Sequence, residues 1–241
     1  MDAPSEPLRH TTKPLGPSKA VVQLSAIHHR FGTHRVLAGI DLTVNQGECV
    51  VLYGTNGSGK STLLALLSTR YHLHTGSYLL DGLDVTLHGD AARDKLVFVG
   101  HHTHLYGHLT PMENLLFFTD LRGITITNHR IREAVEAVGL AKVADKPVQW
   151  FSAGMRKRLA LARMLLADPL LLLLDEPYSA LDLQGVSWLN EMLTRYLQQG
   201  GAVVMASHDP ERVAALSHRP HQLTRGQLLP MTRPDEESYA C

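Results

Sequence analysis

Residues 54–62 read Gly-Thr-Asn-Gly-Ser-Gly-Lys-Ser-Thr and fit the pattern G-x-x-x-x-G-K-[ST]. An apolar run at 49–53 predicts a buried strand before them, and the apolar residues 62–67 predict a helix after them. The glycines let the backbone turn tightly and direct successive N–H groups at an anion, and the helix start adds its positive end. The stretch therefore predicts a phosphate-binding loop.

If the loop binds a nucleotide, several of its side chains should contact the phosphates or Mg²⁺. We expect Lys60 to reach the β- and γ-phosphates and the Ser61 hydroxyl to ligate Mg²⁺. A glycine-rich turn before a lysine can also be an ordinary loop, but the flanking strand and helix favour nucleotide binding. The residues expected at the nucleotide are Gly54, Asn56, Gly57, Ser58, Gly59, Lys60, Ser61 and Thr62.

Composition limits the other classes of function. The 241 residues, 44% of them apolar, suit one large domain or a domain with an added lobe. Lys+Arg and Asp+Glu number 23 each, so the charge does not indicate a nucleic-acid partner. Two cysteines, Cys49 and Cys241, give no disulfide framework and suit a reducing compartment.

This chain is not expected to cross a membrane itself. Its longest strongly apolar run, 170–174, is far too short for a span. Residues 1–19 are rich in proline and polar side chains and lack the apolar core of a secretory signal, so we expect a flexible lead-in. Residues 231–241 are expected to form a polar tail. If the protein acts at a membrane, another chain must cross it.

Further candidate residues stand where predicted strands end. Asp175 and Glu176 close an apolar run, and a buried carboxylate pair is costly unless it meets a cation or takes part in proton chemistry. The run 202–207 delivers His208 to the end of another strand. Since ligands bind at the carboxyl ends of strands in parallel α/β sheets, we expect these side chains to converge on the phosphates.

An aromatic residue lies between the strands predicted near 21–27 and 40–44. A lone Phe is more often a core residue, but the phosphate loop downstream favours Phe31 as a platform for a nucleobase. Strands are also predicted at 78–82 and 96–100. The loop after the second of these holds four histidines within 101–108, for which a metal or haem site is one interpretation. The lack of cysteine or clustered carboxylates favours solvated or phosphate-facing histidines.

Successive helices then interrupt the alternation of strand and helix. A capping box at Thr110 to Glu113 predicts a helix over 111–122, and a second helix is expected at 128–138. Ser152 is expected to cap a third helix, where the N–H groups of residues 153–154 would offer a second anion site. The basic residues 156–158 could instead form a solvated helix face. We expect a helical lobe, about 103–165, inserted into the nucleotide-binding core.

Taken in order, these motifs resemble the nucleotide-binding subunit of ATP-binding-cassette (ABC) transporters. They are Phe31, the phosphate loop, Ser-Ala-Gly-Met at 152–155, Leu-Leu-Leu-Leu-Asp-Glu at 171–176, Ser-Ala-Leu-Asp at 179–182 and Ser-His at 207–208. The resemblance covers about residues 20–228 and implies an α/β fold over 20–230. That fold has a RecA-like P-loop NTPase core with a mostly parallel sheet, an antiparallel β region and the helical lobe.

The family resemblance also implies an ATPase in which two copies pack head to tail. Each ATP would lie between the phosphate loop of one copy and the signature stretch, 152–155, of the other. Glu176 becomes the general base and His208 a contact to the γ-phosphate. The implied assignments are Lys60, Glu176 and His208 for catalysis, Ser61, Asp175 and His102 for Mg²⁺, and Phe31, Ser152, Gly154 and Asp182 for the nucleotide and the dimer interface.

Two positions depart from the family pattern. His102 stands where a Gln usually touches Mg²⁺ and the membrane subunit, and imidazole suits Mg²⁺ less well than an amide oxygen. Met155 ends the signature in place of Gln, so we expect weaker or altered dimer contacts.

Within the family, residues 99–101 and 109–115 look similar to the haem-exporter ATP-binding subunit of cytochrome c maturation. This similarity implies a separate integral membrane permease and a peripheral location on the cytoplasmic face of the inner membrane. The alternatives are the ATPase of another type-2 exporter, for lipid, polysaccharide or drug, and a soluble ABC ATPase such as an iron-sulfur assembly module.

Overall fold

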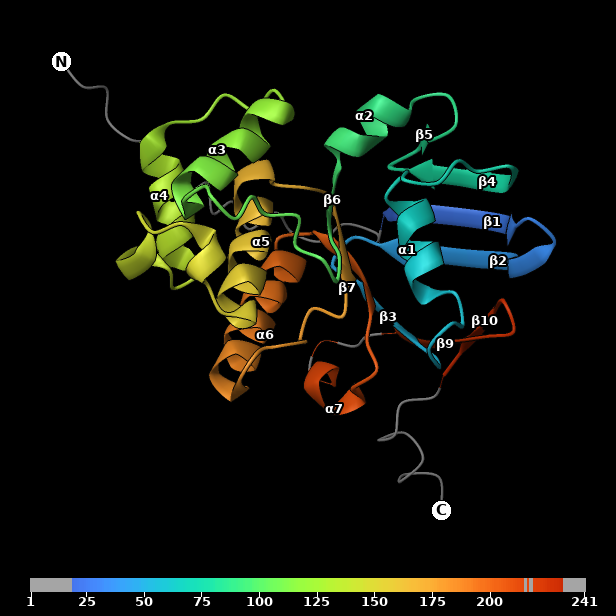
Figure 1. Cartoon of the computed structure of the whole chain (residues 1–241). Helices are drawn as coiled ribbons and strands as arrows, with labels where there is room; N and C mark the ends of the chain where they lie inside the picture. Colours follow the sequence, from blue (N-terminus) through green and yellow to red (C-terminus); the bar gives the residue numbers. More distant parts are fainter. Residues whose placement is uncertain (1–18, 215, 217–218, 232–241) are drawn as a thin grey trace.

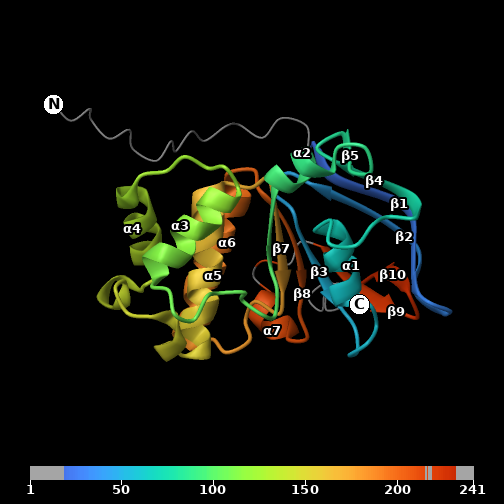
Figure 2. The same cartoon turned by 45° about the horizontal axis from the view of Figure 1, so that its top comes forward.

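The computed structural model describes residues 19–214, 216 and 219–231. Two β-sheets lie on one side of the molecule and a group of helices on the other (Figures 1 and 2). The larger sheet has the strand order β10-β9-β3-β8-β7-β6 and the smaller one the order β2-β1-β4-β5. The expected α/β core with an antiparallel region and a helical lobe is therefore confirmed.

The smaller sheet is antiparallel. Its strands are β1 (Ala20–Phe31), β2 (His34–Asn45), β4 (Thr75–Leu80) and β5 (Leu83–Asp84). In β1, Val22 pairs with Val44 of β2 and with Leu80 of β4, and all three side chains are buried. The predicted strands near 21–27, 40–44 and 78–82 are thus confirmed.

The larger sheet is parallel in its central part. Its predicted strands are β3 (Cys49–Tyr53), β6 (Leu96–Val99), β7 (Leu171–Asp175) and β8 (Ala202–Ala206). These strands are continuous apolar runs because both faces of a parallel sheet are covered. β9 (Arg219–Thr224), parallel to β3, and β10 (Gln227–Pro230), antiparallel to β9, extend the sheet at one edge.

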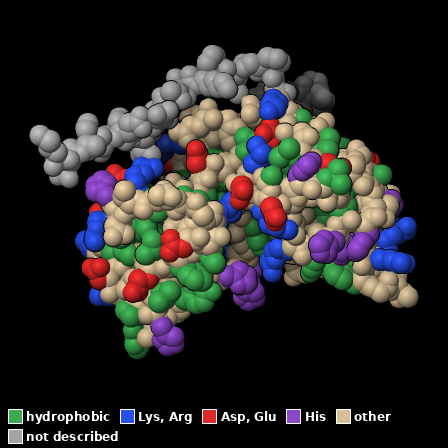
Figure 3. All heavy atoms as spheres, turned by 90° about the horizontal axis from the view of Figure 1, so that it is seen from above, with side chains coloured by type: hydrophobic (Ala, Val, Ile, Leu, Met, Phe, Trp, Pro, Cys, Tyr) green, Lys and Arg blue, Asp and Glu red, His purple; other side chains and the backbone are tan. Residues whose placement is uncertain are grey.

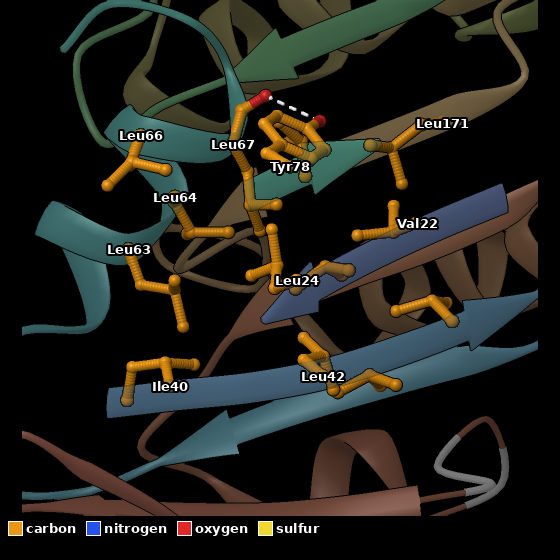
Figure 4. Close-up of a cluster of buried hydrophobic side chains, with 14 of the residues drawn as sticks. Val22, Leu24, Ile40, Leu42, Leu63, Leu64, Leu66, Leu67, Tyr78 and Leu171 are labelled. Atoms are coloured by element: carbon orange, nitrogen blue, oxygen red, sulfur yellow. Dashed lines mark hydrogen bonds between the residues drawn. The ribbon is translucent and has the colours of Figure 1, made fainter. Parts of the chain in front are cut away.

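The phosphate-loop helix α1 (Lys60–Leu67) lies between the two sheets. Leu63, Leu64 and Leu67 are fully buried against residues of both sheets (Figure 4). The Tyr78 hydroxyl donates to the carbonyl of Leu67 at 3.0 Å and so ties the end of α1 to β4. Burying one leucine side chain stabilises the fold by about 1.5–3 kcal/mol, so these contacts fix the direction of the helix.

Four longer helices form the other side of the molecule. They are α3 (Pro111–Leu121), α4 (Asn128–Ala137), α5 (Ala153–Ala167) and α6 (Leu183–Gln198). The capping box of α3 is present, since Thr110 Oγ1 accepts from the Glu113 N–H while the Glu113 carboxylate accepts from the Thr110 N–H. The shorter elements are α2 (Gly89–Asp94), α7 (Pro210–Val213) and two 3₁₀ turns, Ala141–Val143 and Val148–Trp150.

The expected lead-in and tail lie outside the described residues, apart from Lys19 and Met231. Lys19 belongs to the folded unit, because its ammonium pairs with Asp81 and its carbonyl accepts from the Gln46 N–H at 2.9 Å. Within the described ranges, none of the helices combines the length and apolar character needed to span a bilayer.

Cys49 gives a direct test of the packing of the larger sheet. Its side chain is fully buried at the start of β3, and burial raises the pKa of the thiol to about 12. At pH 8 only about one molecule in 10⁴ would then carry the reactive thiolate. A Cys241→Ser variant, which retains only Cys49, should not react with a disulfide reagent while folded and should react stoichiometrically in denaturant. Fast reaction of the folded variant would contradict this packing.

Candidate functional site

The phosphate loop has the backbone that its glycines predict. Gly54, Gly57 and Gly59 have φ values of 149°, 80° and 108°, which residues with a Cβ rarely adopt. A Cβ on Gly54 would lie 2.4 Å from the carbonyl oxygen of Leu223 in β9. The loop is therefore closed against a strand that comes much later in the chain.

Lys60 reaches back across this loop. Lys60 is 9% exposed, and its ammonium donates to the carbonyls of Gly54 at 2.7 Å and Thr55 at 3.1 Å. No side chain caps the start of α1, and the buried hydroxyl of Ser58 has no hydrogen-bond partner within the described part of the chain. Free N–H groups, an unsatisfied hydroxyl and a nearby ammonium together fit a bound phosphate chain.

Strand register brings the predicted carboxylates to the same edge as the loop. Leu52 of β3 pairs with Ala206 of β8, which pairs with Asp175 of β7. The Glu176 N–H donates to the Ala206 carbonyl at 3.0 Å and continues this alignment beyond the strand. The carboxyl ends of these strands lie together on the lower side of the molecule in Figure 1. The backbone thus places the phosphate loop and the two carboxylates at one edge of the sheet, and their convergence on bound phosphates stays a prediction.

Glu176 and His208 are in direct contact. Glu176 Oε2 lies 2.7 Å from His208 Nδ1, and the side chains are 22% and 72% exposed. Glu176 has a φ of 50°, an uncommon conformation for a residue with a side chain, and its carbonyl accepts from the Ser179 hydroxyl at 2.8 Å. The backbone thus turns this carboxylate out of the sheet towards His208.

Asp175, by contrast, stays within the end of the strand. It is 8% exposed, and its carboxylate accepts no hydrogen bond from the residues that the structure describes. Ser61, in the first turn of α1, is exposed. A carboxylate and a hydroxyl that are not committed to protein donors fit the oxygen ligands that Mg²⁺ prefers.

Phe31 lies at the end of β1 with 47% of its surface exposed. Its ring makes edge contacts with His29, at 4.8 Å between centroids, and with Tyr71, at 5.5 Å. Burial and the neighbouring His74 lower the pKa of His29. Tyr71 was missed from the sequence because it follows α1, far along the chain from β1, whereas His29 is two residues before Phe31 and so lies on the same face of the strand. Stacking of a base on Phe31 stays a prediction.

The signature stretch 152–155 lies at the start of α5, and the 179–182 motif lies at the start of α6. Ser152 caps α5 as predicted, its hydroxyl accepting from the Met155 N–H at 3.2 Å. A Cβ on Gly154 would lie 2.8 Å from the Ala180 carbonyl oxygen, so the 152–155 and 179–182 motifs are in close contact. Asp182 is an exposed N-cap for α6 and accepts from the Gly185 N–H at 2.8 Å. In Figure 1 this group and the phosphate loop lie at separate places, on either side of the end of the sheet.

His102 lies in the loop after β6. Its ring is exposed and packs against those of His101 and His104, at 5.3 and 6.4 Å. Figure 3 shows histidine side chains at the surface between the helical side and the sheets. Among residues 19–214, 216 and 219–231, no three His, Cys, Asp or Glu side chains cluster as they would around a metal ion. The role of His102 at Mg²⁺ stays a prediction.

The basic stretch 156–158 is not simply a solvated face. Lys157 is only 3% exposed, and its ammonium donates to the Gly100 carbonyl at 3.3 Å. Its position could have been inferred, because Lys157 precedes the buried residues Leu161 and Met164 at intervals of one and two helical turns. The burial of this cation was not predicted.

The sequence of this chain is similar to those of known proteins. Residues 37–179, more than half of the chain, match the family described as ABC transporter. The chain is 38% identical over 199 residues to the cytochrome c biogenesis ATP-binding export protein CcmA of Xanthomonas campestris, covering 83% of this chain and 89% of that protein. It is 36% identical over 190 residues to CcmA of Escherichia coli K12, covering 79% and 90%.

Solved structures of low sequence identity share the fold. An ATP-binding subunit of an ABC transporter superposes with a TM-score of 0.82 at 21% identity, over 90% of this chain and 92% of that one. An ATP-binding cassette in its ADP conformation superposes with a TM-score of 0.79 at 20% identity, with the same coverage.

Proposed function

This chain belongs to the ABC transporter family of ATP-binding proteins, and on that basis we propose that it hydrolyses ATP to drive a separate membrane permease in cytochrome c maturation. One observation of the structure supports this most strongly. The Glu176 carboxylate contacts His208 at the carboxyl edge of the sheet where the phosphate loop begins. A base candidate and a phosphate cradle thus share one edge.

The chemistry follows from the charges at that edge. Phosphoryl transfer requires positioning and charge stabilisation more than covalent catalysis. We propose that Glu176 accepts a proton from the attacking water, that His208 contacts the γ-phosphate, and that Lys60 leaves the loop carbonyls to bind the β- and γ-phosphates. Mg²⁺ bound with ATP would neutralise part of the phosphate charge. Ser61 and Asp175 are the residues that would hold it, with His102 as a third candidate.

The site of one chain is incomplete without a second copy. Ser152 and Gly154 stand at a helix start of the same chain but away from its phosphate loop, so we propose that they bind the γ-phosphate held by a partner. In a head-to-tail homodimer each copy supplies these two residues to the ATP held by the other, so both sites are completed. Asp182, exposed beside this helix start, would then lie at the interface.

Two substitutions at Ser152 separate capping from phosphate binding. Asp and Asn both cap helices well, so Ser152→Asp and Ser152→Asn should leave α5 intact. The Asp variant places a negative charge against the partner's γ-phosphate and should abolish ATP-dependent dimerisation. The Asn variant should dimerise. Size-exclusion chromatography with ATP, in a hydrolysis-deficient Glu176→Gln background, measures this. Unaltered dimerisation of the Asp variant would contradict the head-to-tail arrangement.

The pathway is proposed from the named relatives. Since those proteins are ATP-binding export proteins of cytochrome c biogenesis, we infer that this chain serves haem export or release there. It would work as a peripheral subunit at the cytoplasmic face of the inner membrane. Cells that lack this chain should fail to attach haem covalently to c-type cytochromes, as seen by haem staining of gels. Normal attachment in such cells would contradict this pathway.

A further inference from the structure

Lys157 is a buried cation beside the proposed hydrolytic site. It lies on α5, which packs against β6 and β7 through Ala160 and Leu161. Parallel register pairs Val99 with Leu174, so Gly100, the residue after β6, lies beside Asp175 at one strand spacing, ~4.8 Å. The ammonium bonded to the Gly100 carbonyl therefore lies next to the end of β7.

Burying an ammonium is costly unless opposite charge is close. The described partner of Lys157 is a neutral carbonyl, and burial lowers the pKa of its ammonium, whereas Asp175 and Glu176 act in the opposite direction. Asp175 and Glu176, the carboxylates assigned to Mg²⁺ and to the attacking water, are thus the nearby groups that favour the charged form of Lys157.

A second cation of α5 provides a comparison. Arg163 lies further along the helix and donates to the His104 carbonyl at 2.9 Å, in the same loop after β6. Burial lowers the pKa of Arg163 as well, but Tyr106 is the group that opposes this shift, and no carboxylate does. Two hydrogen bonds, from Lys157 and Arg163, therefore hold the loop after β6 to α5. Of these two cations, Lys157 is the one influenced by Asp175 and Glu176.

We propose that Lys157 is a positioning residue that keeps the loop after β6 and the Asp175–Glu176 pair at fixed positions relative to α5, the helix that begins with the signature stretch. This inference rests on the proposed ATPase function. Ser152 and Lys157 are five positions apart on one rigid helix, about 7.5 Å along its axis. A shift of α5 on binding the partner's ATP is thereby carried to the hydrolytic site of its own chain, through a backbone carbonyl rather than through the side chain of His102.

The test compares Lys157→Met, Lys157→Arg and Arg163→Met in the full chain. Lys157→Met should lower kcat about 10-fold, leave KM for ATP within about twofold, and remove cooperativity in ATP concentration. Lys157→Arg, which keeps the positive charge, should retain at least half of the wild-type kcat. Arg163→Met should lower the melting temperature but keep kcat within about twofold. If Lys157→Met does not fold, Lys157→Gln, which keeps a donor for Gly100 without the charge, should show the same loss of kcat.

Two results would overturn the inference while wild-type ATPase activity is present. One is an unchanged kcat in Lys157→Met or Lys157→Gln. The other is an equal loss of kcat in Arg163→Met, which would reduce Lys157 to a general packing role. Absence of ATPase activity in the wild-type chain would contradict the proposed function instead, so the two failures are distinguishable.

Discussion

The Glu176→Gln variant is expected to bind ATP normally while its steady-state hydrolysis falls by about 10²–10⁴-fold, the usual contribution of a general base. Gln has the same shape and can still hydrogen-bond to His208, but its amide cannot accept a proton from water. The structure places this carboxylate 2.7 Å from His208, partly exposed at the edge of the sheet. ATP turnover and ATP affinity should be measured on the same preparation.

Glu191→Gln is a matched control for this variant. Glu191 lies on α6, where its exposed side chain pairs with Arg195 at 3.6 Å. Its loss removes one negative charge far from the reaction and should keep turnover within about twofold. Near-normal turnover in Glu176→Gln would refute the assignment of the base.

Replacing Lys60 by Met should weaken ATP binding about 100-fold and abolish measurable hydrolysis. A charge-assisted hydrogen bond contributes about 1.5–3 kcal/mol, and the ammonium is expected to form such bonds with two phosphates. In the structure it donates to the carbonyls of Gly54 and Thr55, from which it must move to reach the nucleotide. Equilibrium dialysis with labelled ATP measures the affinity.

Folding should survive this change, because the released carbonyls lie in a solvent-accessible loop where water can replace the ammonium. The melting temperature should therefore stay within a few degrees of wild type. Lys142→Met, which removes an exposed lysine from a 3₁₀ turn of the helical lobe, is the control and should bind ATP normally. ATP affinity in Lys60→Met within about twofold of wild type would contradict the phosphate site.

Much of the fold could be predicted because its signals are local. Continuous apolar runs mark β3, β7 and β8, since both faces of a parallel sheet are buried. The helix starts at Thr110 and Ser152 follow from capping chemistry, which depends on a few consecutive residues. The phosphate loop depends on glycines at fixed spacing and has the predicted backbone.

Other features depend on contacts between distant segments and could not be predicted. β9 alternates buried and exposed residues, contains Pro220 and lies beside β3, which is remote in the sequence. The closing of the phosphate loop against Leu223 depends on that pairing. Lys157 is a different case, because its helical spacing to the buried Leu161 and Met164 indicates the inward face of α5, although it stands among three successive basic residues.

We propose that this ATPase works on a membrane permease of the cytochrome c maturation pathway. The most direct test is to tag the full chain, isolate it from its native membranes in mild detergent, and identify the copurifying integral membrane protein by mass spectrometry. We predict a permease of the cytochrome c maturation type, present with the wild-type chain. A permease of an unrelated exporter would contradict the pathway, and recovery with soluble partners only would contradict transport itself.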